Sequence, residues 1–116
     1  MNSGSNPAAR GTVVVLFVTG GGQTSPASVD GQVWQGPGGL EAAVSAELQH
    51  LSNIPRAAMA VNYAGPVPGV VAGVQQLNLL IPADLPPAFL SGVTGNNNYM
   101  SVSVGGSTVT VPVVVR

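Results

Sequence analysis

The sequence predicts an all-β domain of the immunoglobulin-like or jelly-roll-like β-sandwich class, with about seven strands. Three observations favour it: short runs rich in β-branched residues recur along the chain, several alternate apolar with polar side chains, and clusters of Gly, Pro and Asn separate them. A chain of 116 residues is long enough for one domain with a sizeable core. We therefore expect an N-terminal arm or linker over residues 1–11 and a sandwich over residues 12–116.

The first two segments contrast sharply in composition. Residues 1–11 are small and polar, and segments of this kind are ordered mainly when something holds them, so we expect a neighbouring chain to hold this arm. The run TVVVLFVT, residues 12–19, is too short for a typical helix and precedes three glycines. It predicts a strand buried on both faces. Residues 23–39 are rich in Gly and Pro and predict a long surface loop with one short edge strand.

Residues 40–52 are ambiguous from their own pattern. Leu40, Val44 and Leu48 fit one face of a helix, and the Ala, Glu, Leu and Gln of this stretch favour helix by propensity. Alternate residues from Val44 to His50 also fit a strand. The residues alone leave both structures open and slightly favour the helix.

Two strands are predicted in the middle of the chain. Residues 56–64 alternate, with Met59, Val61 and Tyr63 on one side, and the Gly-Pro-rich residues 65–69 predict a rigid connector. In residues 74–82, one face carries Leu77, Leu79 and Ile81. The opposite face carries Gln76, Asn78 and Leu80, and the apolar Leu80 does not fit a face that is otherwise polar there.

The C-terminal residues give the clearest pattern. Residues 83–98 hold prolines, glycine and three asparagines and predict a loop. Met100, Val102 and Val104 alternate with serines, Gly105-Gly106 fits a two-residue hairpin turn, and alternate valines follow from Val109 to Val115. Pro112 marks this last strand as an edge strand.

The charge content excludes several functions. Lysine and cysteine are absent, and the chain has only three arginines, four side-chain carboxylates and one histidine. So few cations cannot neutralise a run of phosphates or hold an anionic lipid surface, and no apolar run is long enough for a membrane helix. We expect no cofactor, no metal and no catalysis, since His50 is the lone histidine and the carboxylates show no paired spacing.

Several motifs carry a resemblance to a known family over about three-quarters of the chain. They are NPAARG at residues 6–11, GQT at 22–24, YAG at 63–65, PG at 68–69 and QLNLLIP at 76–82. The chain resembles the Ig-like C-terminal domain of large secreted proteins of Solibacter and related acidobacteria. That resemblance implies an Ig-like sandwich, an exported protein, no catalytic residues, and a strand over residues 44–51.

Two functions fit these expectations. The first is an extracellular or cell-surface structural protein, a fibre or surface-layer subunit whose copies join into a helical polymer by β-strand addition. The alternative is a carbohydrate- or protein-binding adhesive module of a larger secreted protein. Candidate assembly residues are Val13, Val15, Phe17, Leu80, Val111 and Val113. Candidate glycan contacts are Trp34 and Tyr99.

Overall fold

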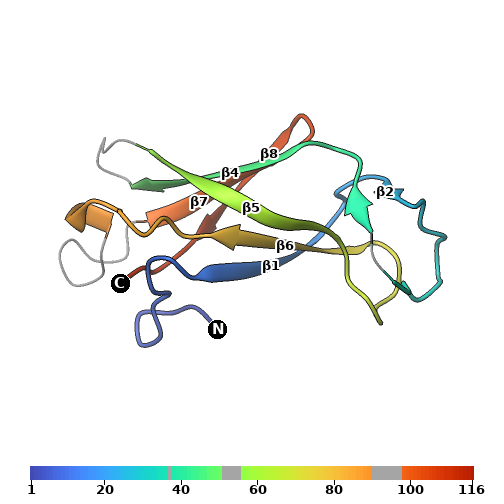
Figure 1. The fold of residues 1–116 in the computed structure, drawn as a ribbon, viewed down its shortest axis with the longest axis horizontal. Coiled ribbons are helices and arrows are strands. Elements are labelled where there is room, and N and C mark those ends of the chain that lie inside the picture. The colour runs from blue at the N-terminus through green and yellow to red at the C-terminus, as the bar shows by residue number, and fades with distance from the viewer. Residues whose placement is uncertain (37, 51–55, 90–97) are drawn as a thin grey trace.

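The computed structural model describes residues 1–36, 38–50, 56–89 and 98–116 (Figure 1). Six antiparallel strands form one curled sheet in the order β1-β6-β5-β4-β7-β8, and two short strands, β2 and β3, form a second sheet. The strands are β1 (Val13–Thr19), β2 (Thr24–Ser25), β3 (Gly39–Leu40), β4 (Val44–His50), β5 (Ala57–Pro66), β6 (Val74–Leu80), β7 (Asn98–Val104) and β8 (Ser107–Pro112). The all-β prediction is confirmed, and the curled sheet is consistent with a β-sandwich.

The core lies inside the curl of the six-stranded sheet. Leu77, Leu79 and Ile81 are fully buried, as their alternation in the sequence predicts. Met100 and Val102 of β7 join them, and a short 3-10 turn over Pro87–Phe89 adds the fully buried ring of Phe89. Phe89 belongs to a stretch that the sequence predicts only as a loop.

The ambiguous segment is a strand. β4 pairs with β5 on one side and β7 on the other, in register Ala46↔Met59 and Ala46↔Val102. Its residues are buried alternately, and Leu48 is fully buried. Pairing on both sides outweighs a helix propensity of a few tenths of a kcal/mol per residue. The predicted final residue of this strand, Leu51, lies outside the described residues.

The prediction that the first strand is buried on both faces is wrong. β1 is an edge strand that pairs with β6, and its residues alternate between half-buried and exposed. Val14, Leu16 and Val18 face the core, whereas the side chains of the intervening positions face outward. An apolar run therefore does not show by itself that both faces of a strand are covered.

The structure of β5 corrects two further expectations, the first through a β-bulge and the second through the length of the strand. The pairing with β6 shifts between Val61 and Tyr63, so that Val61 pairs with Leu79 but Tyr63 pairs with Asn78. Because Asn78 belongs to the outer face of β6, Tyr63 leaves the side shared by Met59 and Val61. The strand also continues through Gly65 and Pro66, which pair with β6 although the sequence predicts a connector there.

The C-terminal hairpin forms as predicted. β7 and β8 pair from Tyr99↔Pro112 to Val104↔Ser107, which leaves Gly105 and Gly106 as the two turn residues. Of the two, Gly105 takes a positive φ of 59°, as the first central residue of a type II′ turn does. Pro112 lies on β8, at one edge of the sheet, as expected.

The N-terminal arm is held by its own chain, which corrects the expectation of a neighbour. Ala8 N donates to Val114 O, Arg116 N donates to Ala8 O, and both bonds are 2.9 Å long. The side chain of Asn2 donates to Val114 O and accepts from Val114 N, each at 2.7 Å. These bonds place the arm beside the C-terminal segment, where Figure 1 shows both termini.

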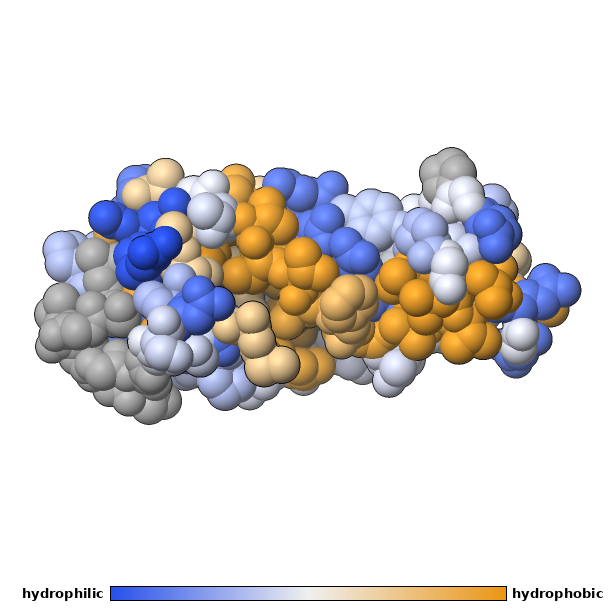
Figure 2. All heavy atoms as spheres, turned by 90° about the horizontal axis from the view of Figure 1, so that it is seen from below, coloured by the Kyte–Doolittle hydropathy of each residue, from blue (hydrophilic) through white to orange (hydrophobic). Residues whose placement is uncertain are grey.

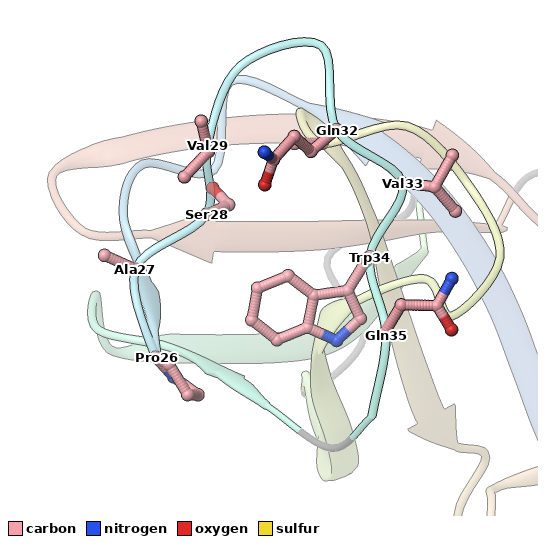
Figure 3. Close-up of a pocket in the computed structure, with 9 residues that line it drawn as sticks. Pro26, Ala27, Ser28, Val29, Gln32, Val33, Trp34 and Gln35 are labelled. Atoms are coloured by element: carbon pink, nitrogen blue, oxygen red, sulfur yellow. The ribbon is translucent and has the colours of Figure 1, made fainter.

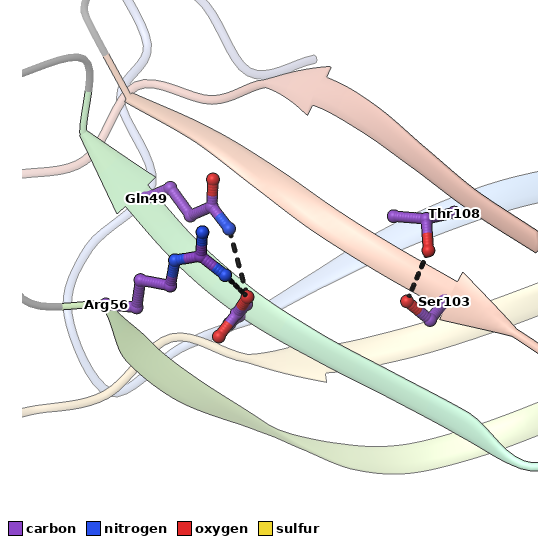
Figure 4. A network of polar contacts seen from close by, with 5 residues as sticks. Gln49, Arg56, Ser103 and Thr108 are labelled. Atoms are coloured by element: carbon purple, nitrogen blue, oxygen red, sulfur yellow. Dashed lines mark hydrogen bonds and ion pairs between the residues drawn. The ribbon is translucent and has the colours of Figure 1, made fainter.

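The outer face over β4 and β7 is polar. Arg56 forms an ion pair of 2.8 Å with Glu47, which also accepts a hydrogen bond from Gln49 (Figure 4). Ser103 and Thr108 share a hydrogen bond across the hairpin. Both side chains of the ion pair are solvent-exposed, so it contributes about 0–1 kcal/mol. This face has the polar surface that a strand facing water normally carries.

Substituting Gly38 by alanine is expected to destabilise the domain by about 1–3 kcal/mol. A Cβ at Gly38 would lie 2.5 Å from Cζ2 of Trp34 and 3.1 Å from Cγ of Pro66, so the indole or the end of β5 must shift. Gly106→Ala is the matched control, because its Cβ would meet nothing within 4 Å. Urea denaturation of both variants measures the difference, and equal stabilities would contradict the close packing of Trp34 on Gly38.

Candidate functional site

The most distinctive feature of the surface is a seam between the two edge strands of the curled sheet. The seam is a groove between β1 and β8, and it encloses a cavity of about 370 Å³. Apolar side chains gather over this side of the molecule, where β1 runs (Figure 2). Residues from both edges and from the buried floor line the groove, among them Leu16, Phe17, Leu77, Val102, Val109 and Val111.

The seam leaves inward-facing side chains uncovered. Val109 pairs with Val102 across the hairpin, and cross-strand partners share a face of the sheet. Val102 is 3% exposed, yet Val109 is 53% exposed. On the opposite edge, Leu16 pairs with the fully buried Leu77 but is itself only half-buried. The core is therefore open along the seam, as it would be if a strand were missing there.

The free edge of β1 has unpaired backbone groups. Gly11 N donates to Ile81 O and Ile81 N donates to Thr12 O, both at 2.9 Å, and the register with β6 then continues without a break to Thr19. In an antiparallel pair, successive residues point their N–H and C=O alternately toward and away from the partner. The residues whose N–H and C=O groups point away from β6 are Val13, Val15, Phe17 and Thr19.

The outward side chains of β1 form an exposed apolar stripe. Val13, Val15 and Phe17 are 42%, 47% and 66% exposed. Leu80, the cross-strand partner of Val13, is half-buried on the same face. Neither β1 nor β8 contains a charged residue, although exposed edge strands commonly carry charges that prevent pairing with another chain. Four of the predicted assembly residues thus lie together on the outer face at this edge, three of them on β1 and Leu80 on the neighbouring β6.

The other two predicted assembly residues lie on the C-terminal side of the seam and differ from each other. Val111 is half-buried and lines the seam. Val113 is 2% exposed and belongs to the core, together with Val115. A terminal valine segment so deeply packed in its own chain cannot be donated to a neighbour without unfolding. Val113 is therefore not part of the accessible edge, contrary to the expectation from sequence.

A buried amide fixes the end of the seam next to β1. The side chain of Gln75, 4% exposed, accepts from Gly21 N at 3.0 Å and donates to Gly22 O at 3.4 Å. A Cβ at Gly21 would lie 2.7 Å from Oε1 of Gln75, so a larger residue there would displace this amide. The sequence analysis did not predict these two hydrogen bonds, although a Gln at an inward-facing position of β6 indicates that its amide has buried partners.

The two aromatic residues predicted as glycan contacts lie in different places. Trp34 is 9% exposed in the loop after β2, and its Nε1 donates to Gly36 O at 2.7 Å. Tyr99 is the second residue of β7 and pairs with Gln49 on one side and Pro112 on the other. Trp34 lines a hollow of about 300 Å³ beside Gln32 and Gln35, as Figure 3 shows, and Tyr99 is not among its lining residues. The described contacts do not join the two rings into one platform.

Titratable groups are dispersed over the described part of the chain. Within it, no three His, Cys, Asp or Glu side chains come close enough together to hold a metal ion. The same residues include no helix with the length and apolarity needed to span a lipid bilayer.

Comparison with known proteins gives no relative. No family model matches the chain, and no curated protein or solved structure matches it either. The resemblance to acidobacterial Ig-like domains therefore stays a prediction from the sequence motifs.

Proposed function

We propose that this domain is an extracellular structural protein whose copies assemble by β-strand addition at the seam, as in a fibre or surface layer. The observation that carries the proposal is the exposure of Val109, an inward-facing side chain on a strand of the core. A second copy that places a strand at the seam covers this side chain and satisfies the outward N–H and C=O groups of β1. Main-chain bonds then give the contact strength, and alternate side chains fill the groove.

The composition of the edges supports association between identical chains. The formal net charge is −1, and the residues of β1 and β8 carry no charge, so two copies can bring these edges together without bringing like charges together. Burying a Val or Phe side chain contributes about 1.5–3 kcal/mol. Phe17 and Val109 therefore give a substantial driving force once the edges meet.

The donor is a folded edge rather than a free segment. The arm is hydrogen-bonded to residues 114–116 of its own chain, and residues 113–115 are buried. Donating either segment would first break these contacts, whereas an edge strand pairs as it stands. The arm, with Ala8 and Ala9 as its apolar residues after Met1, would also fill the groove poorly.

Sedimentation velocity over a range of concentrations tests the proposal. We expect the sedimentation coefficient to rise with concentration, and to do so nearly equally at low and high salt because charges do not hold the contact. Negative-stain electron microscopy of the concentrated sample then shows the form of the polymer. A sample that sediments as the 11.5 kDa monomer at every concentration would overturn the proposal.

A second candidate function is binding of a neutral carbohydrate in the hollow beside Trp34. The observation that favours it is an aromatic ring next to two glutamine amides that have no hydrogen bond with described residues. Aromatic faces and planar amides are common in sugar sites. A glycan array with the wild type and Gln32→Ala decides this candidate: loss of a neutral-glycan signal in the variant supports it, and no signal from the wild type contradicts it.

A further inference from the structure

We infer that the partner of β1 is β1 of a second copy, paired antiparallel about a twofold axis at Phe17. This inference rests on the proposed function, since it names the edges that meet in strand addition. It follows from which part of the edge is open, from the direction of the free backbone groups, and from the side chains that such a pair would bring together.

The arm lies beside one half of the β1 edge and leaves the other half open. Met1, Asn2, Asn6 and Pro7 lie across a hollow of about 320 Å³ from Val13–Val15. The seam cavity instead borders residues from Leu16 to Gly21. A second strand therefore meets the least obstruction at the Phe17 end, which also carries the most exposed large side chain of the strand.

The backbone permits this register. An antiparallel pair centred on Phe17 places Phe17 opposite itself and Val15 opposite Thr19 of the second copy. All of these residues direct their N–H and C=O groups to the free edge, so each opposed pair exchanges two hydrogen bonds. The register thus uses free groups of β1 without breaking any bond to β6.

The side chains are self-complementary in this arrangement. On the outer face, the two Phe17 rings become direct cross-strand neighbours, a pairing that stabilises sheets. On the inner face, Leu16 of one copy lies directly opposite Val18 of the other, which extends both open cores toward each other. The contact surface is the same on both copies, as a twofold interface requires. This contact closes into a pair, so the pair is the unit of the assembly, and a fibre or layer grows through further contacts between pairs.

Single-cysteine variants test the register, because the natural chain has no cysteine. Residues opposite each other in a hydrogen-bonded pair have Cα atoms about 5.5 Å apart, which is within the range of a disulfide. We expect a mixture of Val15→Cys and Thr19→Cys to form a disulfide-linked dimer under mild oxidation. Neither variant alone should do so, since identical positions would be offset by about 13 Å along the strands.

Thr110→Cys on β8 is the matched control, and it should not cross-link with either variant. A dimer from Val15→Cys alone would overturn the inference, because it would place the axis at Val15. Cross-linking of Thr110→Cys with either variant would overturn it too, by pairing β1 with β8. In both cases the proposed strand addition would stand. If the wild type and all variants sediment as monomers, the proposed function itself fails.

Discussion

Phe17→Lys is expected to abolish assembly while leaving the fold intact. The side chain of Phe17 is 66% exposed, so the monomer loses little when it is replaced. In the paired edge, the substitution removes the largest apolar contact and places two lysines directly opposite each other, which is destabilising in a sheet. We expect sedimentation velocity to show a monomer at concentrations where the wild type is assembled.

Val29→Lys is the control for this substitution. Val29 is a valine of similar exposure, 57%, in the loop after β2 and away from the seam, and the variant carries the same added charge. We expect it to assemble like the wild type. If both variants are monomeric, added charge alone prevents association. If Phe17→Lys assembles normally, the β1 edge is not the contact.

Phe89→Ala is expected to lower the free energy of unfolding by about 3–5 kcal/mol, the range for truncating a buried Phe. The ring is fully buried and lies edge-on to His50, with centroids 6.2 Å apart. The buried side-chain amide of Asn98 donates to the backbone carbonyl of Phe89 at 2.5 Å. Phe89 thus fills one end of the core and is held by β4 and β7 neighbours, so its removal leaves a cavity that the sheet cannot easily close.

Phe17→Ala removes the same atoms at an exposed site and is the control. Urea denaturation of both variants is measured at a low protein concentration, where the protein is monomeric. We expect it to change monomer stability by about 0.5 kcal/mol or less. The two variants should separate folding from assembly, because Phe89→Ala weakens the monomer and Phe17→Ala weakens the association. Similar losses of stability would show that the core is not closed at Phe89.

Local patterns predicted most of the strands because alternation and turn residues are properties of short segments. The inward set of β6 and the Gly105-Gly106 hairpin are examples. Residues 44–50 could not be decided from their own pattern, since pairing with β5 and β7 outweighs propensity there. The bulge that turns Tyr63 outward also depends on the partner strand, and no residue of β5 by itself predicts it.

The candidate site was predictable in part. Val13, Val15 and Phe17 were predicted as assembly residues, but on a strand buried on both faces, so their exposure on an edge strand was not predicted. The seam could not be predicted, because it depends on how far the sheet curls and on where the arm packs. The burial of Val113 has the same origin, since Val114 and Arg116 pair with the arm and draw the last residues into the core.

Amide hydrogen exchange with and without assembly tests strand addition most directly. The N–H groups of Val13, Val15, Phe17 and Thr19 point to the free edge, whereas those of Val14, Leu16 and Val18 already bond to β6. On assembly, we predict new protection at Val15, Phe17 and Thr19, with little change at the alternate amides. Assembly that leaves these three amides as exchangeable as in the monomer would contradict strand addition at β1.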